Sequence, residues 1–440
     1  MFQQICPLIS LTKYKALVKL KSLIIFRISG ELTMRFSLSV LILLCLFALS
    51  CDNDPQISKG WISESGSFKD DSGSCVAIDE ARNVFVTGYT YGNLYGDTNL
   101  GRDTSDIFLM KFNPDGTKQW TKQWGNSLND FGRSVTTDNS GNVYVTGETN
   151  GNIDGNTNTN QFYDLFITKF NSYGELEWKT HWGTASNDYG SSVSVDNTGS
   201  IYVTGQTEGS FDNFSNEGFT DPFLTKINNE GKVQWTKQWG TNDRDYGYSV
   251  TTDMNGEIYV AGASGSTFLG KWDSDGNNLW TKQWGISPSE GGRSIVVDDD
   301  GSIYTAGRYT IEDTCTSVEE GQDPSCEFIT TAYLTKLNSE GVEQWITSEI
   351  EFSPVSIAMD SSGNIYVTGS ENNDIYLTTF NNKGKQQWTE TWNSGKKDGG
   401  LSVAVDTKRN VFLTGFTEGS INYGTPYGNS DIFLIKLPAK

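Results

Sequence analysis

The chain has 440 residues, of which 36% are hydrophobic, and its 33 Lys and Arg residues are outnumbered by 54 Asp and Glu residues. Nearly all of this acidity lies beyond residue 50, because the first fifty residues contain six of the basic residues and one acid. Nucleic acid is therefore not an expected partner, since phosphate binding requires positive charge. The single histidine, His181, excludes zinc sites built from several histidines and leaves one conceivable Ser–His pair.

The N-terminal region has the features of an export signal. Residues 34–50, MRFSLSVLILLCLFALS, combine a basic start with an apolar run too short to span a bilayer, which is typical of a signal peptide. The ALSC sequence at residues 48–51 resembles the bacterial lipobox, although Leu stands second before the cysteine and Ala third. Lipidation of Cys51 is favoured because the polar residues 51–58 suit a tether. The alternative is cleavage of the same bond by ordinary signal peptidase without lipidation.

Residues 1–33 precede a complete signal, which export does not require. We interpret them as a mis-assigned upstream extension, with Met34 as the true start of the protein. A longer leader or a re-entrant anchor is the alternative. The expected product is an extracytoplasmic protein whose lipid at Cys51 holds it to a bacterial membrane, in the outer membrane or at the cell surface.

Cysteine usage is consistent with an oxidising compartment. Cys315 and Cys326 bracket a ten-residue loop and are predicted to form a disulfide. Cys75 is left unpaired within the apolar strand SCVAID, where a buried free thiol is the expected state.

One motif returns along the whole chain beyond residue 60: an apolar strand that ends in Thr-Gly or Ala-Gly, as in NVYVTG. Alternation at period two, with Gly or Asn at the turns, predicts four short antiparallel strands in each copy. Seven copies of about 54 residues predict an all-β fold, a single seven-bladed β-propeller over residues 59–440. The seven glycines are Gly88, Gly147, Gly205, Gly262, Gly307, Gly369 and Gly415, and an aspartate stands nine residues before each: Asp79, Asp138, Asp196, Asp253, Asp298, Asp360 and Asp406.

The ring of blades is predicted to close with strands from both ends of the propeller. The last copy stops after its third strand, whereas residues 59–66 supply an isolated fourth strand in which Trp61 matches a repeated tryptophan. This segment should pair with residues 431–437 and so remove the exposed sheet edges. Length varies mainly between the second and third strands, and this connection is long in five blades: 89–105, 148–163, 206–220, 308–330 and 416–430.

These repeats resemble the SBBP β-propeller repeats of secreted and surface bacterial proteins. The resemblance is carried by the pattern DxFxxKxxxxGxxxWxxxxG followed by DxxGNxYVTGxT, which recurs at least six times over residues 60–440. It implies a propeller architecture and an extracytoplasmic location. The family has no established reaction, so the resemblance implies neither catalytic residues nor a cofactor.

Three repeated sets of residues are candidate sites, and each has a structural alternative. The seven aspartates of the D-x-x-G turns could bind metal, but bonding to their own turns is favoured. Tryptophan pairs such as Trp120 and Trp124 could stack on sugars, but packing between blades is favoured. Acids that precede the first strands could encircle one mouth of the central channel and hold a cation or a basic ligand segment, with turn bonding again as the alternative. These acids are Asp71, Asp130, Asp188, Asp245, Glu290 and Asp398.

The sequence favours a binding role over catalysis. His181 stands beside Trp182 where three sister blades have Gln, which indicates a surface substitution rather than a catalytic group. We expect a monomeric binding or scaffold protein without a cofactor, whose five long loops recognise a protein or glycan. The alternative is an extracytoplasmic enzyme, a glycan-active or quinone-type propeller, with an unidentified active site. In either case the short hairpins should face the membrane and the long loops should face outward.

Overall fold

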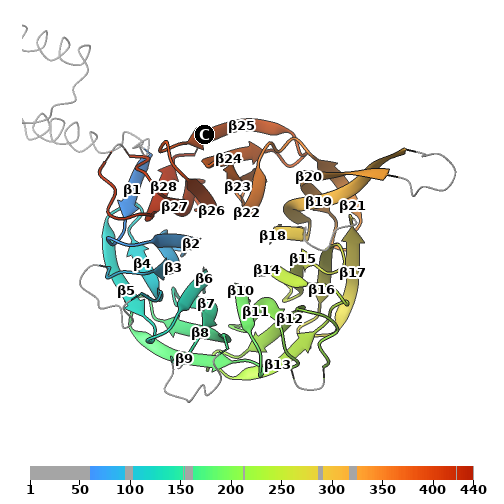
Figure 1. Cartoon of the computed structure of the whole chain (residues 1–440), viewed down its shortest axis with the longest axis horizontal. Coiled ribbons are helices and arrows are strands. Elements are labelled where there is room, and N and C mark those ends of the chain that lie inside the picture. The colour runs from blue at the N-terminus through green and yellow to red at the C-terminus, as the bar shows by residue number, and fades with distance from the viewer. Residues whose placement is uncertain are drawn as a thin grey trace, which may run out of the picture. The chain divides into compact units, whose positions relative to one another are not determined.

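The computed structural model describes residues 60–94, 103–151, 153, 162–211, 214–285, 291–316, 325–422 and 424–439. Its regular elements are 28 β-strands in seven four-stranded antiparallel sheets, arranged as blades around a central axis (Figure 1). The predicted seven-bladed propeller is confirmed. Within the described residues, no helix has the length and apolar character needed to cross a bilayer. The predicted leader, Cys51 and tether, together with Glu290, lie outside these residues.

In six blades the strands follow the chain from the axis outward (Figure 1). Blades one to three consist of β2 (Asp71–Ile78), β3 (Val84–Thr90), β4 (Asp106–Phe112) and β5 (Lys118–Trp124); β6 (Asp130–Thr137), β7 (Val143–Thr149), β8 (Asp164–Phe170) and β9 (Leu176–Trp182); and β10 (Asp188–Val195), β11 (Ile201–Thr207), β12 (Asp221–Ile227) and β13 (Val233–Gln238). Blades four to six consist of β14 (Tyr246–Thr252), β15 (Ile258–Ala263), β16 (Thr267–Trp272) and β17 (Asn278–Trp284); β18 (Gly291–Val297), β19 (Ile303–Thr316), β20 (Ser325–Leu337) and β21 (Glu343–Thr347); and β22 (Ser353–Met359), β23 (Ile365–Glu371), β24 (Asp374–Phe380) and β25 (Gln386–Trp392).

The seventh blade joins the two ends of the propeller. It consists of β26 (Asp398–Val405), β27 (Val411–Thr417), β28 (Asp431–Leu437) and, as its outermost strand, β1 (Trp61–Ser65). Trp61 lies opposite Lys436, and Ser65 lies opposite Ile432. The predicted closure is confirmed, and it covers the edge that β28 would otherwise expose.

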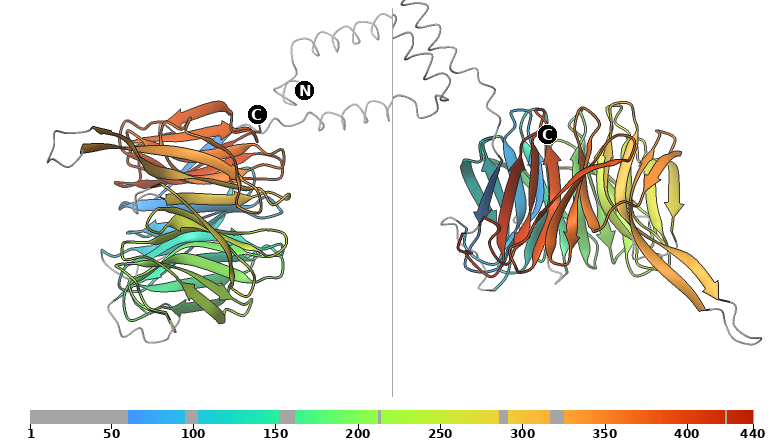
Figure 2. Two further views of the ribbon diagram at one scale, coloured as in Figure 1. Left: turned by 90° about the vertical axis from the view of Figure 1, so that its right-hand side faces the viewer. Right: turned by 90° about the horizontal axis from the view of Figure 1, so that it is seen from above.

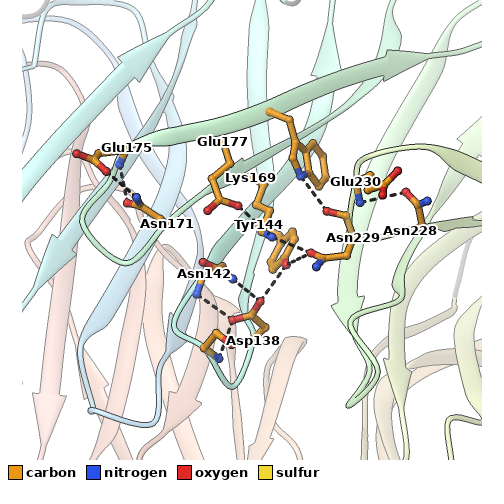
Figure 3. Close-up of polar contacts among 12 residues, drawn as sticks. Asp138, Asn142, Tyr144, Lys169, Asn171, Glu175, Glu177, Asn228, Asn229 and Glu230 are labelled. Carbon is orange, nitrogen blue, oxygen red and sulfur yellow. Dashed lines mark hydrogen bonds and ion pairs between the residues drawn. The ribbon is translucent and has the colours of Figure 1, made fainter.

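The aspartate turns explain why each inner hairpin forms. In blade two, the Asp138 Oδ1 atom accepts hydrogen bonds from the backbone N–H groups of Ser140 and Asn142, both at 2.9 Å (Figure 3). The Asp138 Oδ2 atom accepts one from the Tyr144 hydroxyl at 3.0 Å. In all seven blades this aspartate accepts a bond from the backbone N–H four residues on. The turn interpretation of these aspartates is therefore confirmed.

Neighbouring blades are joined by the outer strands. Tyr144, Lys169 and Trp178 face one another across β7, β8 and β9. The Lys169 Nζ atom lies 5.4 Å from the centre of the Tyr144 ring and donates to the Asn229 Oδ1 atom of blade three at 2.7 Å (Figure 3). The Trp178 Nε1 atom donates to the Asn229 carbonyl at 3.1 Å. The predicted packing of tryptophans between blades is confirmed.

Blade five departs from the loop expected at 308–330. β19 and β20 continue beyond the ends of the other strands and project from the ring as a two-stranded ribbon (Figure 1 and Figure 2). The backbone register puts Cys315 directly opposite Cys326. Facing residues of antiparallel strands have Cα atoms about 4.5–5.5 Å apart, a span that a disulfide can bridge. The bond itself stays a prediction.

Candidate functional site

The two faces of the propeller carry different connections. Because the strands of a blade are antiparallel, the first-to-second and third-to-fourth hairpins lie on one face, which we term the hairpin face. The second-to-third loops and the links to the next blade lie on the opposite face, which we term the loop face. The first strand of each blade runs from the loop face to the hairpin face along the axis.

An axial cavity of about 540 Å³ is lined by the first strands of all seven blades. Two consecutive residues of each first strand contribute to its wall, so that two rings of seven side chains surround the axis. The first, the variable ring, consists of Ser74, Arg133, Ser191, Tyr248, Arg293, Val355 and Leu401. The second, the serine ring, consists of Cys75, Ser134, Ser192, Ser249, Ser294, Ser356 and Ser402.

A β-bulge in every first strand produces this arrangement. In blade one, Gly73 pairs with Gly88 and Cys75 pairs with Thr87, which leaves Ser74 without a partner in the ladder. The same shift occurs at the corresponding residues of the other six blades. A bulge redirects the side chain of the extra residue, and here that residue belongs to the variable ring.

The serine ring links the blades around the axis. The Ser134 Oγ atom accepts a hydrogen bond from the Val193 N–H of the next blade at 3.3 Å. Four other serines of the ring make the same contact at 3.1–3.2 Å, with Val250, Ile357, Val403 and Val76 as donors. These hydroxyls therefore have a structural role that explains their repetition.

Cys75 occupies the position of a serine in this ring. Cys75 is a free thiol, as predicted, but its side chain is partly exposed and lines the cavity instead of being fully buried. The Ser402 hydroxyl donates to the Cys75 Sγ atom at 3.7 Å. The alternation of the strand failed to predict this orientation because the bulge at Ser74 shifts its phase.

Two arginines of the variable ring bring positive charge to the cavity. Arg133 forms an ion pair with Glu148, and its guanidinium lies 4.8 Å from the centre of the Phe131 ring. Glu148 is only 2% exposed, and burial raises its pKa although Arg133 opposes this effect. The Arg293 guanidinium lies 4.1 Å from the centre of the Tyr248 ring. Among the described residues, Arg293 has no ion-pair partner.

Aromatic side chains continue from the cavity onto the loop face. Tyr89 and Phe131 make an edge contact with ring centres 5.1 Å apart. Tyr163 lies 6.3 Å from Phe131 and 5.8 Å from Tyr189, measured between ring centres. These four side chains are partly exposed and cross blades one to three. They form a surface on which a flat or apolar part of a ligand can pack.

The acids predicted at the channel mouth have a different environment. Asp71, Asp130, Asp188, Asp245 and Asp398 are at most 2% exposed, and none of them lines the axial cavity. Each accepts a hydrogen bond from the backbone N–H four residues earlier, such as the Asn126 N–H at 2.6 Å from Asp130. Within the described part of the chain, no three His, Cys, Asp or Glu side chains are grouped to hold a metal ion. The geometry favours the turn interpretation for these five residues.

Burial changes the titration of several of these acids. It raises the pKa of Asp71 to about 6, that of Asp130 to about 7 and that of Asp188 to about 6. Each of the three also lies close to the aspartate that begins the third strand of the preceding blade. Asp106 and Asp130, for example, flank the same glycine, Gly125. These carboxylates are linked to the packing between blades.

His181 lies at the position of a structural clamp. In blades one and three, this position is filled by Gln123 and Gln238, whose side chains join the third-strand aspartate to the neighbouring loop. The Gln123 Nε2 atom donates to Asp106 Oδ2 at 2.9 Å and to the Gly92 carbonyl at 3.0 Å. His181 is half-buried near Asp164, where its charge opposes the increase in the carboxyl pKa that burial causes.

The variable ring is the feature that sequence reasoning missed. Its signal is the fourth position of the D-x-G-x-S pattern, which changes from Ser to Arg, Tyr, Val and Leu while the following residue is Ser in six of the seven blades. A position that varies inside a repeated scaffold is not fixed by packing between repeats. A comparison of this position across the seven copies would have predicted a surface that faces open space and is available for ligand binding.

Comparisons with known proteins agree with this architecture. Residues 57–96, 119–154, 177–212, 234–268 and 346–376 match the family model of the SBBP β-propeller repeat. A stretch of 164 residues, 34% of this chain, is 27% identical to the regulatory protein FlaEY of Caulobacter vibrioides and covers 17% of that protein. A stretch of 152 residues, 29% of this chain, is 28% identical to the uncharacterized WD repeat-containing protein L264 of Acanthamoeba polyphaga mimivirus and covers 11% of it. The matches thus span less than a fifth of either curated relative.

Among solved structures, the chain is similar to the WD40 domain of Pan2 from Neurospora crassa. The TM-score is 0.49 at 10% sequence identity, and the alignment covers 87% of this chain and 97% of that one. Each of the five family matches begins within or just before the outermost strand of one blade and continues through the first two strands of the next. The matched repeat is therefore offset from the blade by one strand, as the closure by β1 requires. Five stretches of this chain are therefore identified as SBBP-type β-propeller repeats.

Proposed function

We propose that this protein is a non-catalytic binding module that acts outside the cytoplasm and takes a protein or a glycan on its loop face. The observation that carries this proposal is the location of variation among the seven repeats. The variable ring lies at the axis, and the loops of unequal length lie on the loop face. Recognition in repeat scaffolds resides in segments that differ between copies, because the repeated positions are needed for packing.

Exposed aromatic residues support the choice of the loop face. Phe68, Phe219 and Tyr427 are 72%, 67% and 57% exposed, and all three lie in loops of this face. Phe68 and Tyr427 come from adjacent loops, since a Cβ at Gly428 would lie 2.7 Å from the Ser67 carbonyl. Exposed rings that lie close together provide contact area at a small cost in side-chain entropy.

The hairpin face is less suited to recognition. Its Asn-x-x-Gly turns receive the Lys and Trp side chains of the preceding blade, as Asn229 receives Lys169 and Trp178. These repeated Lys, Trp and turn residues are thus committed to the interfaces between blades. The enzyme alternative has no comparable support, because His181 takes the position of a glutamine clamp rather than a place in the axial cavity.

The closing strand favours an orientation in which the loop face is turned away from the membrane. Trp61 pairs with Lys436, near the end of β28 that lies at the hairpin face. A tether of eight residues before β1 extends at most about 28 Å, so a lipid at Cys51 would hold the hairpin face towards the membrane. Protease added to intact cells should therefore cut the loops at 91–105 before the hairpin at 171–174. Earlier cleavage of the hairpin would contradict this orientation.

Blade six supplies the design for a test of the loops. Its second-to-third connection is the two-residue turn Asn372–Asn373, and the Asp398 N–H still donates to the Asn373 carbonyl at 2.9 Å. Blade one makes the equivalent contact with its long loop, from the Asp130 N–H to the Ser105 carbonyl at 2.9 Å. A short turn can therefore replace a long loop and keep this contact between blades.

The experiment compares the mature protein with a variant in which residues 91–105, 150–163, 208–220 and 418–430 are each replaced by Asn-Asn. Both proteins are applied to a glycan array and to immobilised surface proteins. We expect the variant to lose binding while its circular dichroism and unfolding transition remain those of a propeller. Tyr173→Ser, at an 80% exposed position of the hairpin face, is the control and should bind normally. Equal binding by the loop variant, or hydrolase or dehydrogenase activity in the purified protein, would contradict the proposal.

A further inference from the structure

The charge of the axial cavity is opposite to that of the chain. The sequence has 21 more acidic than basic residues, yet two of the seven positions in the variable ring are arginines and none is acidic. Nothing in the packing requires charge at this position, because other blades have Ser, Val or Leu there. The arginines therefore favour an anionic ligand in the cavity, whereas the acidic remainder of the molecule repels anions.

Arg293 is the stronger of the two candidates for contact with a ligand. It is exposed to the cavity and rests on the Tyr248 ring at 4.1 Å, and no ion pair joins it to another described residue. A guanidinium presents donors in a planar fork that matches a carboxylate, and a ring beneath it holds the fork in place. The free side of this group favours a carboxylate-bearing ligand.

Glu148 adds a second polar group to the cavity wall. Its Oε1 atom pairs with Arg133, whereas its Oε2 atom is buried and accepts no hydrogen bond from another residue. This buried acceptor has no surface that a ligand in the cavity can reach, so Glu148 acts on the cavity through its ion pair with Arg133. Because Arg133 is already paired, the two arginines are not equivalent, and Arg293 is the cationic group that remains for a ligand.

The remaining lining suits a ring with hydroxyl groups. Tyr89, Tyr189 and Phe416 supply partly exposed aromatic faces. Gln206 supplies an amide group, whose Oε1 atom accepts a hydrogen bond from the Ser191 hydroxyl at 3.3 Å. Aromatic faces combined with amide and hydroxyl groups can bind the apolar face and the hydroxyl edge of a sugar at the same time. The volume of about 540 Å³ lies in the range of small-molecule sites, about 300–1,000 Å³.

We infer that the axial cavity binds an acidic oligosaccharide, with a uronic acid carboxylate on Arg293 and sugar hydroxyls near Gln206. This inference rests on the proposed binding role and adds a second site to it, since the anionic glycan binds at the axis and the ligand of the long loops binds separately. An acidic peptide would also offer carboxylates to Arg293. The glycan is favoured because the Gln206 amide and the partly exposed rings of Tyr89, Tyr189 and Phe416 suit a sugar ring with hydroxyl groups.

The test is a calorimetric titration of the mature protein with a galacturonic acid trisaccharide. The neutral galactose trisaccharide and a Glu-rich peptide are titrated in parallel. We expect binding of the acidic sugar alone, weakened by added salt, and a loss of about tenfold or more in affinity for Arg293→Gln. Arg244→Gln is the matched control, because Arg244 stacks on Phe219 at 5.7 Å on the loop face and does not line the cavity. Its affinity should stay within about twofold of the unchanged protein.

Three outcomes would overturn the inference. They are absence of binding of the acidic trisaccharide, equal binding of the neutral one, and an unchanged affinity in Arg293→Gln. Binding of the peptide in place of the sugar would assign the cavity to a protein partner and would also overturn it. The variant with four shortened loops separates this inference from the proposed function, since it should keep the affinity for the acidic trisaccharide even if it loses its other ligands.

Discussion

The hairpin face and the axial cavity use the same repeat in opposite ways. At the hairpin face, Lys169 and Trp178 of blade two meet Asn229 of blade three, and the equivalent residues recur around the ring. In the cavity, each blade contributes the same serine position, but the residue before it differs in type between blades, for example arginine at Arg293 and leucine at Leu401. Seven interfaces of one geometry require the same contacts each time, whereas a side chain that faces open space has no such requirement.

Blade six indicates which repeated residues can be replaced. Thr379, between Tyr366 and Trp388, takes the place of the lysine that in five other blades donates a hydrogen bond to the next blade. At its first strand, Phe352 takes the place of the buried aspartate and stacks on Tyr376 with ring centres 5.2 Å apart. A buried ring can thus fill the position of a buried carboxylate, so the carboxylate is a structural device at this position.

The largest effect should come from removal of the closing strand. A mature chain that begins at Ser67 lacks β1 and leaves β28 as an open edge, with Phe412 no longer covered by Trp61. Because the whole stability of a domain is about 5–15 kcal/mol, we expect loss of cooperative unfolding and association of the open rings. Denaturant unfolding and gel filtration measure both effects. A chain that begins at Lys59 is the control, and equal stability of the two chains would mean that closure contributes little.

The second effect is a dependence of stability on pH that originates at the loop face. Asp71, Asp130 and Asp188 have pKa values of about 6, 7 and 6 in the folded protein, above the value of about 3.9 for unfolded aspartate. The folded state therefore holds these protons more tightly. Their contribution to stability is complete below pH 3.9 and is lost as the pH rises through 6 to 7. Melting temperatures measured from pH 4.5 to pH 8 should fall over this range.

Asp130→Asn tests the origin of this dependence. The amide is neutral at every pH, so the variant should lose less stability between pH 5 and pH 8 than the unchanged protein. Asp115→Asn, on the exposed third-to-fourth turn of blade one, is the control and should keep the full dependence. An unchanged pH profile in Asp130→Asn would show that other groups cause it.

The third prediction compares two glycine turns of the hairpin face, one that contacts a tryptophan of the preceding blade and one that does not. The comparison separates the loss of this contact from the cost of backbone strain. Gly174 and Gly256 both have φ of 78°, so alanine is strained at either site by about 1–2 kcal/mol. A Cβ at Gly174 would lie 2.8 Å from the Trp120 ring of the preceding blade, whereas a Cβ at Gly256 meets nothing within 4 Å. Gly174→Ala should therefore cost about 1–3 kcal/mol more than Gly256→Ala, as in overpacked cores. Equal losses in urea unfolding would mean that the tryptophan docks loosely.

The fold could be predicted from the sequence because the same hairpin and strand pattern is repeated in seven copies. The offset of nine residues between Asp138 and Gly147 reflects a hairpin that one aspartate closes, and the unmatched strand at Trp61 predicted the closure. Contacts made within a hairpin or between identical blades leave a periodic trace in the sequence.

The candidate site could not be predicted in the same way because it depends on β-bulges and residue changes that interrupt the repeated strand pattern. Arg133 and Arg293 reach the axis through a bulge that shifts the alternation of the strand by one residue. Asp71 and Asp130 are the first residues of β2 and β6, but their carboxylates turn back to the links between blades, because the buried backbone N–H groups there need acceptors. The ribbon of β19 and β20 was hidden by its polar composition, which resembles that of a loop.

The smallest effect should arise at Cys75, which occupies the one position of the serine ring that is not a serine. Cys75 lines the cavity, and its sulfur lies 3.7 Å from the Val135 carbonyl, a weaker contact than the hydroxyl contacts elsewhere in the ring. Cys75→Ser would complete the ring, and we expect a change in unfolding free energy of less than about 0.5 kcal/mol. Cys75→Val removes the polar group next to Ser402 and Ser134, so it should cost about 1 kcal/mol. Both values come from urea unfolding. If valine were tolerated as well as serine, the hydrogen bonds of the ring would matter less than its size, and the repetition of serine around the axis would need another cause.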